Sequence, residues 1–192
     1  MKKTYFILLV LFSSVSLFAQ SPWTYGIKAG ANLSGFHTKN STNTDLHGFQ
    51  VGGLVNYQAT DIFAVQAELH YLQKGGAFTK TEIGSGSFKS YYTESKLSYL
   101  EVPLVAQLIV FKKLRVEIGP QISFLVSDKT SIDGEEIESD PNSTDLGLAG
   151  GLSYYFNHAI FVQTRYVYGL QEVFEDYSYK NSVVTLSVGY LF

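Results

Sequence analysis

The strongest constraint on the fold is a period-two alternation of apolar with polar or small side chains, which recurs in eight segments of the sequence. The segments are residues 25–34, 49–58, 63–72, 99–108, 115–124, 145–156, 160–170 and 184–192. Successive side chains of a β-strand point to opposite faces, so each segment is predicted to be a strand with unlike faces. Pro103 lies inside one segment and lacks a backbone N–H, which predicts a bulge or a locally unpaired position there.

The links between these segments alternate strictly in length. QATD, FKK and NHA join three neighbouring pairs, whereas the other links are much longer and polar, as in SDKTSIDGEEIESDPNST. Alternate links of an antiparallel barrel lie at opposite ends, so the short links share one end. Short periplasmic turns and long extracellular loops are typical of outer-membrane barrels. We therefore predict an all-β fold: an eight-stranded antiparallel up-and-down transmembrane β-barrel in the cell outer membrane.

The amino terminus has the composition of a secretory signal peptide. It has a basic start at Lys2 and Lys3, an apolar stretch from Tyr5 to Phe12 and a small-residue exit at Ala19. This stretch is far shorter than the ~20 apolar residues of a membrane-spanning helix. We predict a signal peptide over residues 1–19 and a single outer-membrane β-barrel domain over residues 20–192.

Composition restricts the classes of partner. The sequence has no cysteine, so an exported chain of this kind must be held together without disulfides. Its 14 basic and 17 acidic residues give a net charge of −3, which argues against nucleic-acid binding. The expected partners are outer-membrane lipid, the barrel-assembly machinery and possible secretion or surface proteins.

The alternation alone does not say whether the apolar face of each strand points into the barrel or out of it. A soluble lipocalin-like barrel has its apolar face inside, whereas a membrane barrel turns it toward lipid. Aromatic residues of the apolar face gather at strand ends, as in the girdles of membrane barrels. They are Tyr57, Phe63, Tyr154, Phe156, Tyr190 and Phe192 by the short turns, and Phe36, Phe78, Phe124 and Tyr168 by the long links. We predict that the apolar face contacts lipid.

The opposite face carries charged residues at mid-strand positions. An eight-stranded barrel has an interior that side chains fill, so these charges must meet inside, and buried charges persist only when paired. We predict an interior polar network with a structural, packing role rather than a catalytic one. Its members are Lys28, Glu68, His70, Tyr99, Glu101, Arg115, Glu117 and Arg165.

The sequence offers no clear catalytic or cofactor motif. HExxH and GxSxG are absent, and the four His residues do not share an obvious end of the barrel. We therefore expect no enzymatic activity and no cofactor. The acidic segment 128–145 has seven carboxylates, and we expect a solvated loop, with a Ca²⁺ site as the alternative.

Several blocks of the sequence resemble a known family. AELHYLQKGG (67–76), YLEVPLVAQL (99–108), VEIGPQISFLV (116–126), DLGLAGGLSYYF (145–156) and RYVYGL (165–170) are similar to the recurring blocks of PorT-like outer-membrane β-barrels, common in Bacteroidetes. The resemblance implies an eight-stranded outer-membrane barrel that is not an enzyme. The founding member is associated with surface protein secretion by the type IX pathway, but no residue in this sequence carries that role.

The expected function is therefore a small barrel that is structural or acts as a surface interaction module through its extracellular loops. The alternatives are an accessory component of a type IX-like secretion system, a rim enzyme, and a soluble lipocalin-like binder. The carboxyl-terminal Tyr190 and Phe192 resemble the terminal aromatic signal that barrel-assembly machinery recognises. We expect these two residues to direct assembly.

Overall fold

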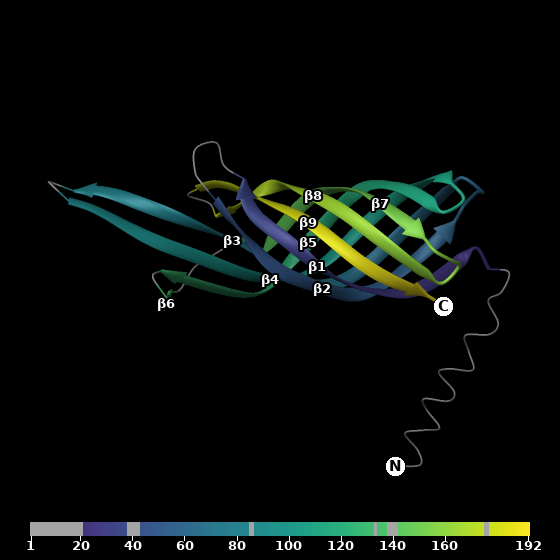
Figure 1. Cartoon of the computed structure of the whole chain (residues 1–192), viewed down its shortest axis with the longest axis horizontal. Helices are drawn as coiled ribbons and strands as arrows, with labels where there is room; N and C mark the ends of the chain where they lie inside the picture. The colour runs from purple at the N-terminus through teal and green to yellow at the C-terminus, as the bar shows by residue number, and fades with distance from the viewer. Residues whose placement is uncertain (1–20, 38–42, 85–86, 133, 138–141, 175–176) are drawn as a thin grey trace, which may run out of the picture.

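The protein is a closed antiparallel β-barrel with a sheet that projects from one end (Figure 1). The computed structural model describes residues 21–37, 43–84, 87–132, 134–137, 142–174 and 177–192. The strands are β1 (Trp23–His37), β2 (Asn43–Gln58), β3 (Phe63–Gly84), β4 (Ser87–Phe111), β5 (Leu114–Ile132), β6 (Glu135–Ile137), β7 (Thr144–Tyr155), β8 (Ile160–Phe174) and β9 (Tyr177–Leu191). The predicted signal peptide, residues 1–19, lies outside the described residues and stays a prediction.

Eight of these strands form the barrel wall. Each pairs antiparallel with its neighbours, β5 pairs directly with β7, and the pairing of β1 with β9 closes the sheet. The three-residue β6 adds only to one edge of β5, by pairs from Thr130↔Ile137 to Ile132↔Glu135. Closure removes the free edges that would otherwise invite aggregation. The predicted eight-stranded barrel is confirmed.

No helix within the described part of the chain is long and apolar enough to cross a membrane.

The short connections and the carboxyl terminus lie at one end of the barrel, opposite the projecting sheet (Figure 1). The link from β7 to β8 is held by Asn157, whose Oδ1 accepts hydrogen bonds from the backbone N–H groups of Ala159 (2.8 Å) and Ile160 (2.7 Å). An Asn side chain that bonds its own following backbone in this way fixes a tight turn. The predicted tight turns are therefore confirmed in position.

The strands are longer than predicted at the opposite, extracellular end. Residues 73–98 were expected to contain a long link, but pairing of β3 with β4 continues from Gln73↔Ser98 to Gly84↔Ser87. The start of the acidic segment was also expected to be a loop, yet β5 continues to Ile132. These boundaries were wrong because backbone pairing can continue where the side chains no longer alternate between apolar and polar.

Pro103 is accommodated without a change of register. Pro103 has no partner on the β3 side, where pairing passes from Ala67↔Leu104 to His70↔Glu101 in one register, whereas on the β5 side it pairs with Gln121. The register shifts of β4 lie elsewhere, at Ser98/Tyr99 and Ile109/Phe111 of its ladder with β5. Of the two predicted outcomes, the one observed is an unpaired position, and only on the β3 side of the strand.

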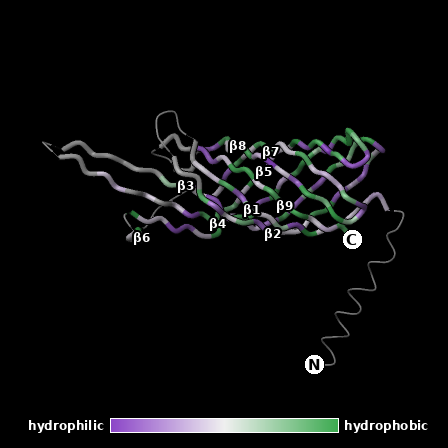
Figure 2. Tube along the Cα trace, viewed as in Figure 1, coloured by the Kyte–Doolittle hydropathy of each residue, from purple (hydrophilic) through white to green (hydrophobic). Residues whose placement is uncertain are grey.

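Exposure follows the predicted alternation along the wall. Glu68 is 3 % exposed and its neighbour Leu69 is 52 % exposed. Apolar and polar residues accordingly alternate along the barrel strands in Figure 2. The outward side chains include, by the short turns, Trp23, Tyr57, Phe63, Tyr154, Phe156, Tyr190 and Phe192, and toward the other end Phe49, Phe124 and Tyr168. Phe36 and Phe78 also belong to the predicted set, but their side chains are not among those that the structure describes.

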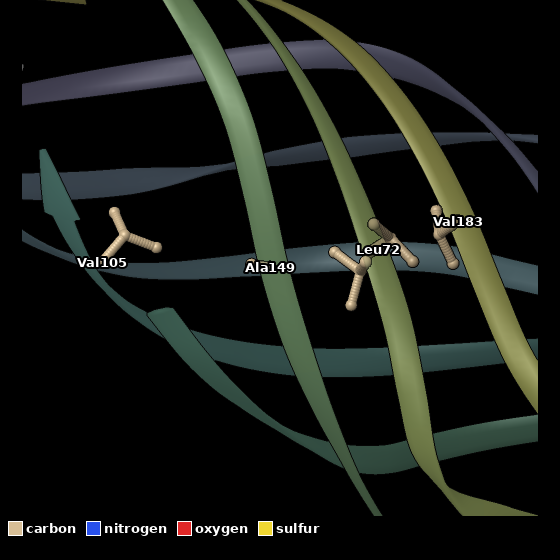
Figure 3. Packing of buried hydrophobic residues seen from close by; sticks show 5 residues of the cluster. Leu72, Val105, Ala149 and Val183 are labelled. Carbon is tan, nitrogen blue, oxygen red and sulfur yellow. The ribbon is translucent and has the colours of Figure 1, made fainter. Parts of the chain in front are cut away.

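Two apolar clusters lie inside the barrel among its polar residues. One consists of Leu72, Val105, Ala149, Val167 and Val183, contributed by five different strands (Figure 3). Ala149, Val167 and Val183 are successive partners across β7, β8 and β9, so this cluster follows one row of hydrogen bonds around the wall. The interior is therefore a packed core at this level.

The second cluster lies nearer the short turns. Tyr155 and Phe161 stack with their ring centroids 5.1 Å apart, and Leu54 and Leu191 complete the group. The Phe161 ring lies over Gly189, where an added Cβ would come within 2.1 Å of Cζ. Glycine at this inward position therefore makes room for a large ring in a narrow barrel.

Candidate functional site: the ionic network inside the barrel

The charged residues of the interior meet in two linked groups, and the first is centred on Glu68. Its carboxylate accepts hydrogen bonds from Nη1 and Nη2 of Arg165 at 2.9 and 2.7 Å, and lies 2.6 Å from Lys28 Nζ. Arg165 also reaches Glu117, with Nε donating to Oε1 at 2.8 Å. All four side chains are buried. A bidentate arginine contact of this kind fixes orientation as well as charge.

The second group is centred on Glu101. Lys74 Nζ donates to Glu101 Oε1 at 3.1 Å and to Asp145 Oδ2 at 2.8 Å. Gln121 and Ser123 on β5 donate to the two oxygens of the same Glu101 carboxylate, at 2.9 and 3.0 Å. The lone pairs of Glu101 are thus satisfied by side chains of two neighbouring strands, β3 and β5, which is what a carboxylate needs to stay buried.

His70 links the two groups. Its Nε2 lies 3.1 Å from Glu101 Oε2 and its Nδ1 lies 3.5 Å from Glu68 Oε2, at 2 % exposure. Gly52 on β2 faces it, and an added Cβ there would come within 2.2 Å of His70 Cβ. The imidazole therefore lies between two carboxylates, with Nε2 at hydrogen-bond distance from Glu101 and Nδ1 near Glu68 but without a hydrogen-bond partner, in a space that a glycine leaves open.

Two aromatic rings complete the network by contacts with cations. Lys74 Nζ lies 4.1 Å from the centroid of the Tyr99 ring, and the Arg115 guanidinium lies 4.0 Å from that of Tyr155. Arg115, which is only half-buried, also donates to Gln107 Oε1 at 3.1 Å. A cation over an aromatic face is stabilised by the ring quadrupole, so these rings act as partners for charge.

A layer of buried amides connects the ion pairs toward the short turns. Gln66 donates to Glu68 at 2.6 Å, Gln107 and Gln163 donate to Glu117 at 3.2 and 3.0 Å, and Lys28 donates to Gln163 at 2.8 Å. The bond from Lys28 to Gln163 joins β1 to β8, and the bond from Gln163 to Glu117 joins β8 to β5, so these two tie together strands that are distant in sequence. Such a filled polar core leaves no reason to expect an aqueous channel.

The structure places all eight residues named from the sequence on the inner side of the wall. Seven of them are buried there, and Arg115 is the half-buried one. Lys74 and Asp145 belong to the same network and were missed. Lys74 lies an even number of positions from Glu68 and His70 on the same strand, so it points to the same side. Extending the alternation beyond Tyr71 would have placed Lys74 in the interior.

Asp145 was assigned to the acidic segment as a possible Ca²⁺ ligand, which its position contradicts. It lies in β7, inside the barrel, and Lys74 occupies one of its oxygens. Asp128 lies in β5 and Glu135 and Glu136 in β6, while 133, 138 and 140 lie outside the described residues. Among the described residues, no group of three or more His, Cys, Asp or Glu could hold a metal ion.

The closed wall, the apolar band outside it and the ionic core inside it together define a transmembrane β-barrel of the outer-membrane type. The family comparison agrees. The chain belongs to the outer membrane protein beta-barrel domain family, whose model matches residues 18–175. The protein is therefore an outer-membrane protein, and its exposed apolar band contacts lipid.

Solved bacterial barrels share this architecture. Ail, the attachment invasion locus protein of Yersinia pestis, aligns with a TM-score of 0.56 at 15 % identity, covering 88 % of this chain and 98 % of Ail. Neisserial surface protein A aligns with a TM-score of 0.58 at 16 % identity, covering 88 % and 97 %. These identities establish the fold alone. No curated protein sequence matches the chain closely enough to count as a relative.

Proposed function

We propose that this protein is a non-enzymatic surface interaction module, in which a rigid barrel carries a projecting extracellular sheet. The observation that carries the proposal is that β3 and β4 stay paired from the barrel wall out to Gly84↔Ser87. The start of the projection is reinforced by β5, which pairs with β4 up to Thr93↔Ile132, and by β6. Pairing gives the projecting backbone a defined path away from the wall, as a surface used for interaction requires.

The interior supports this division of roles. Its carboxylates and cations bind one another, and the ion pairs of Glu68 join β1, β3 and β8. Breaking such buried pairs is costly, so the network is suited to locking the wall rather than to chemistry on a substrate. We assign the packing role to the network as part of this proposal.

The projection can be tested separately from the barrel. A variant in which Phe78 is joined to Thr93 by Asn-Gly removes the outer hairpin and keeps the wall. In cells lacking the wild-type gene, we expect this variant to be as deficient as the null strain in surface adhesion or in cross-linking to surface partners, at equal amounts of barrel. Full complementation by the variant would overturn the proposal.

A second candidate, an accessory role in a type IX-like secretion system, rests on the PorT-like sequence blocks. Two of these blocks, 67–76 and 99–108, carry Glu68, Lys74 and Glu101 of the network. We propose a PorT-like membership on this basis. A tagged chain should then co-purify with secretion subunits, and its deletion should reduce surface secretion. Intact secretion after deletion would exclude this role.

The carboxyl terminus supports a proposed contact with the barrel-assembly machinery. Phe192 lies 59 % exposed, with its ring 5.6 Å from that of Tyr190, and its N–H donates to Tyr25 O at 2.9 Å. We expect deletion of Phe192 to lower the amount of folded protein in cells severalfold but to leave refolding in detergent unchanged. Equal amounts of both proteins in cells would contradict an assembly signal.

A further inference from the structure

His70 is a buried titratable side chain whose two ring nitrogens have different surroundings. Nε2 lies within hydrogen-bond distance of Glu101 Oε2, at 3.1 Å, whereas Nδ1 lies 3.5 Å from Glu68 Oε2 and has no hydrogen-bond partner. An ionised carboxylate only accepts hydrogen bonds, so Nε2 must donate its proton to Glu101. The neutral ring therefore has its single proton on Nε2, and its Nδ1 is an unused acceptor beside an anionic oxygen.

The buried charges around this ring do not balance without it. The first ionic group has two carboxylates and two cations, whereas in the second Glu101 and Asp145 share the single cation Lys74. Burying an unmatched charge is costly, so a positive charge on His70 is favoured beside Glu101. Within the described part of the chain, the buried carboxylates are Glu68, Glu101, Glu117 and Asp145, and the buried lysines and arginines are Lys28, Lys74 and Arg165.

The charged groups around His70 come from several strands. On β2 the directly opposite position is Gly52, which has no side chain, and on β4 it is Glu101. The titratable residues of this region are Glu68 and Lys74 on β3, Tyr99 and Glu101 on β4, Lys28 on β1, Glu117 on β5, Asp145 on β7 and Arg165 on β8. Lys28 and Arg165 oppose a further positive charge, but both bind Glu68 and so already have a counter-charge. The balance of these charges therefore favours a second proton on the ring.

We propose that His70 is a proton-dependent link between the two ionic groups inside the barrel. With one proton the ring binds Glu101 alone, whereas with two it is a cation between Glu68 and Glu101 and compensates the second group. Unfolding separates the ring from these carboxylates, so the second proton stabilises the folded wall. This stabilisation is present in acid and is lost as the pH rises through the range in which imidazole changes charge, about pH 5 to 8. The inference is independent of any role of the projecting sheet.

The first test observes the ring directly and does not require a change at position 70. The full chain is labelled with ¹⁵N-histidine and folded in micelles, with the other three histidines replaced by glutamine so that His70 gives the only ring signals. We expect a neutral ring protonated on Nε2 at about pH 8 and a ring protonated on both nitrogens at about pH 5. A ring whose charge does not change over this range, or a neutral ring protonated on Nδ1, would overturn the proposal.

The second test measures the effect of the proton on stability. The variant His70→Gln keeps an amide that can donate to Glu101 but cannot take up a proton. Urea unfolding in lipid vesicles gives the ratio of the unfolding equilibrium constants of variant and wild type. We expect this ratio to be about tenfold larger at pH 5 than at pH 8, because a hydrogen bond to a charged group contributes about this factor or more.

The matched control is His158→Gln, which removes an imidazole from an exposed position in the turn after β7. Its ratio to wild type should be the same at both pH values, and effects of pH on the other carboxylates cancel because each variant is compared with wild type at the same pH. A ratio for His70→Gln that does not change with pH, or that is larger at pH 8, would overturn the proposal.

Discussion

At the scale of single residues, the environment of a side chain in this wall is set by whether its position along the strand points into the barrel or out of it. Glu68 and Leu69 are adjacent, yet one is bound by Lys28 and Arg165 in the interior and the other faces lipid. Inward positions must also share a narrow space, so large side chains such as Phe161 lie against glycine. Substitutions should therefore have effects that depend on the face and on the opposite residue more than on chemical similarity.

Removal of the Glu68 carboxylate should be among the most damaging single changes. Glu68→Ala leaves Lys28 and Arg165 buried with one fewer counter-charge, and breaking a buried pair by removing one partner costs about 3–5 kcal/mol. Urea unfolding of the barrel in lipid vesicles measures this free energy. The control is Asp61→Ala in an exposed turn, which should change it by less than about 0.5 kcal/mol. Equal effects would show that the network does not stabilise the wall.

Replacing glycine by alanine should destabilise the barrel at an inward position but not at an outward one. Gly189→Ala would bring Cβ to within 2.1 Å of the Phe161 ring, so we expect a loss of about 1–3 kcal/mol in unfolding free energy. At Gly150 the nearest atom to an added Cβ is 4.0 Å away, so Gly150→Ala should be neutral or slightly stabilising. The same urea titration compares the two. Position 150 follows the buried Ala149 in β7 and so faces outward, and a larger loss at Gly150 than at Gly189 would refute this assignment.

At the scale of elements, β3 and β4 have two parts with different partners. Up to Phe78 and Thr93 they pair with β2 and β5 as well as with each other, whereas beyond these residues the described pairs join only β3 to β4. An isolated two-stranded ribbon contributes little stability of its own. The barrel and the projection should therefore be separable.

The hairpin truncation that joins Phe78 to Thr93 tests this separation in vitro. We expect the free energy of unfolding to change by less than about 1 kcal/mol, because an isolated hairpin is at best marginally stable. The gel mobility shift of the folded barrel should persist. A deeper truncation that also removes Lys74 is the contrasting variant and should destabilise the wall, since Lys74 binds Glu101 and Asp145. A barrel that fails to fold after the shorter truncation would contradict the separation.

At the scale of the whole molecule, closure of eight strands around ion pairs, amides and two apolar clusters gives a filled cylinder. The buried side chains come from every strand of the wall, and those of Gln66, Gln107, Gln163 and Phe161 are fully buried. Barrels of this strand number leave an interior just wide enough for side chains. The molecule is thus built as a rigid support and not as a pore.

Planar-bilayer recording tests this conclusion. The refolded chain should show no steady ionic conductance above the bare bilayer, because no continuous water path crosses the filled interior. A sixteen-stranded porin inserted under the same conditions serves as the positive control. Stable open steps from the wild-type chain would contradict the packing described for the interior.

The sequence by itself determined which side chains face lipid and which face the interior, and with them the barrel class and the membrane compartment. Alternation is a local property, since it depends only on the pleat of a strand. It also identified the interior charges, although Lys74 was missed where the apolar half of the pattern ended.

Only the tertiary structure decided which of these residues meet. Arg165 binds Glu68 across 97 positions and Lys74 binds Asp145 across 71. Such contacts depend on the register of every ladder and on closure of the sheet, and neither is encoded in the local alternation of a single strand. The length of the projecting hairpin was likewise decided by backbone pairing. Polar side chains allow such pairing, but their sequence pattern does not predict it.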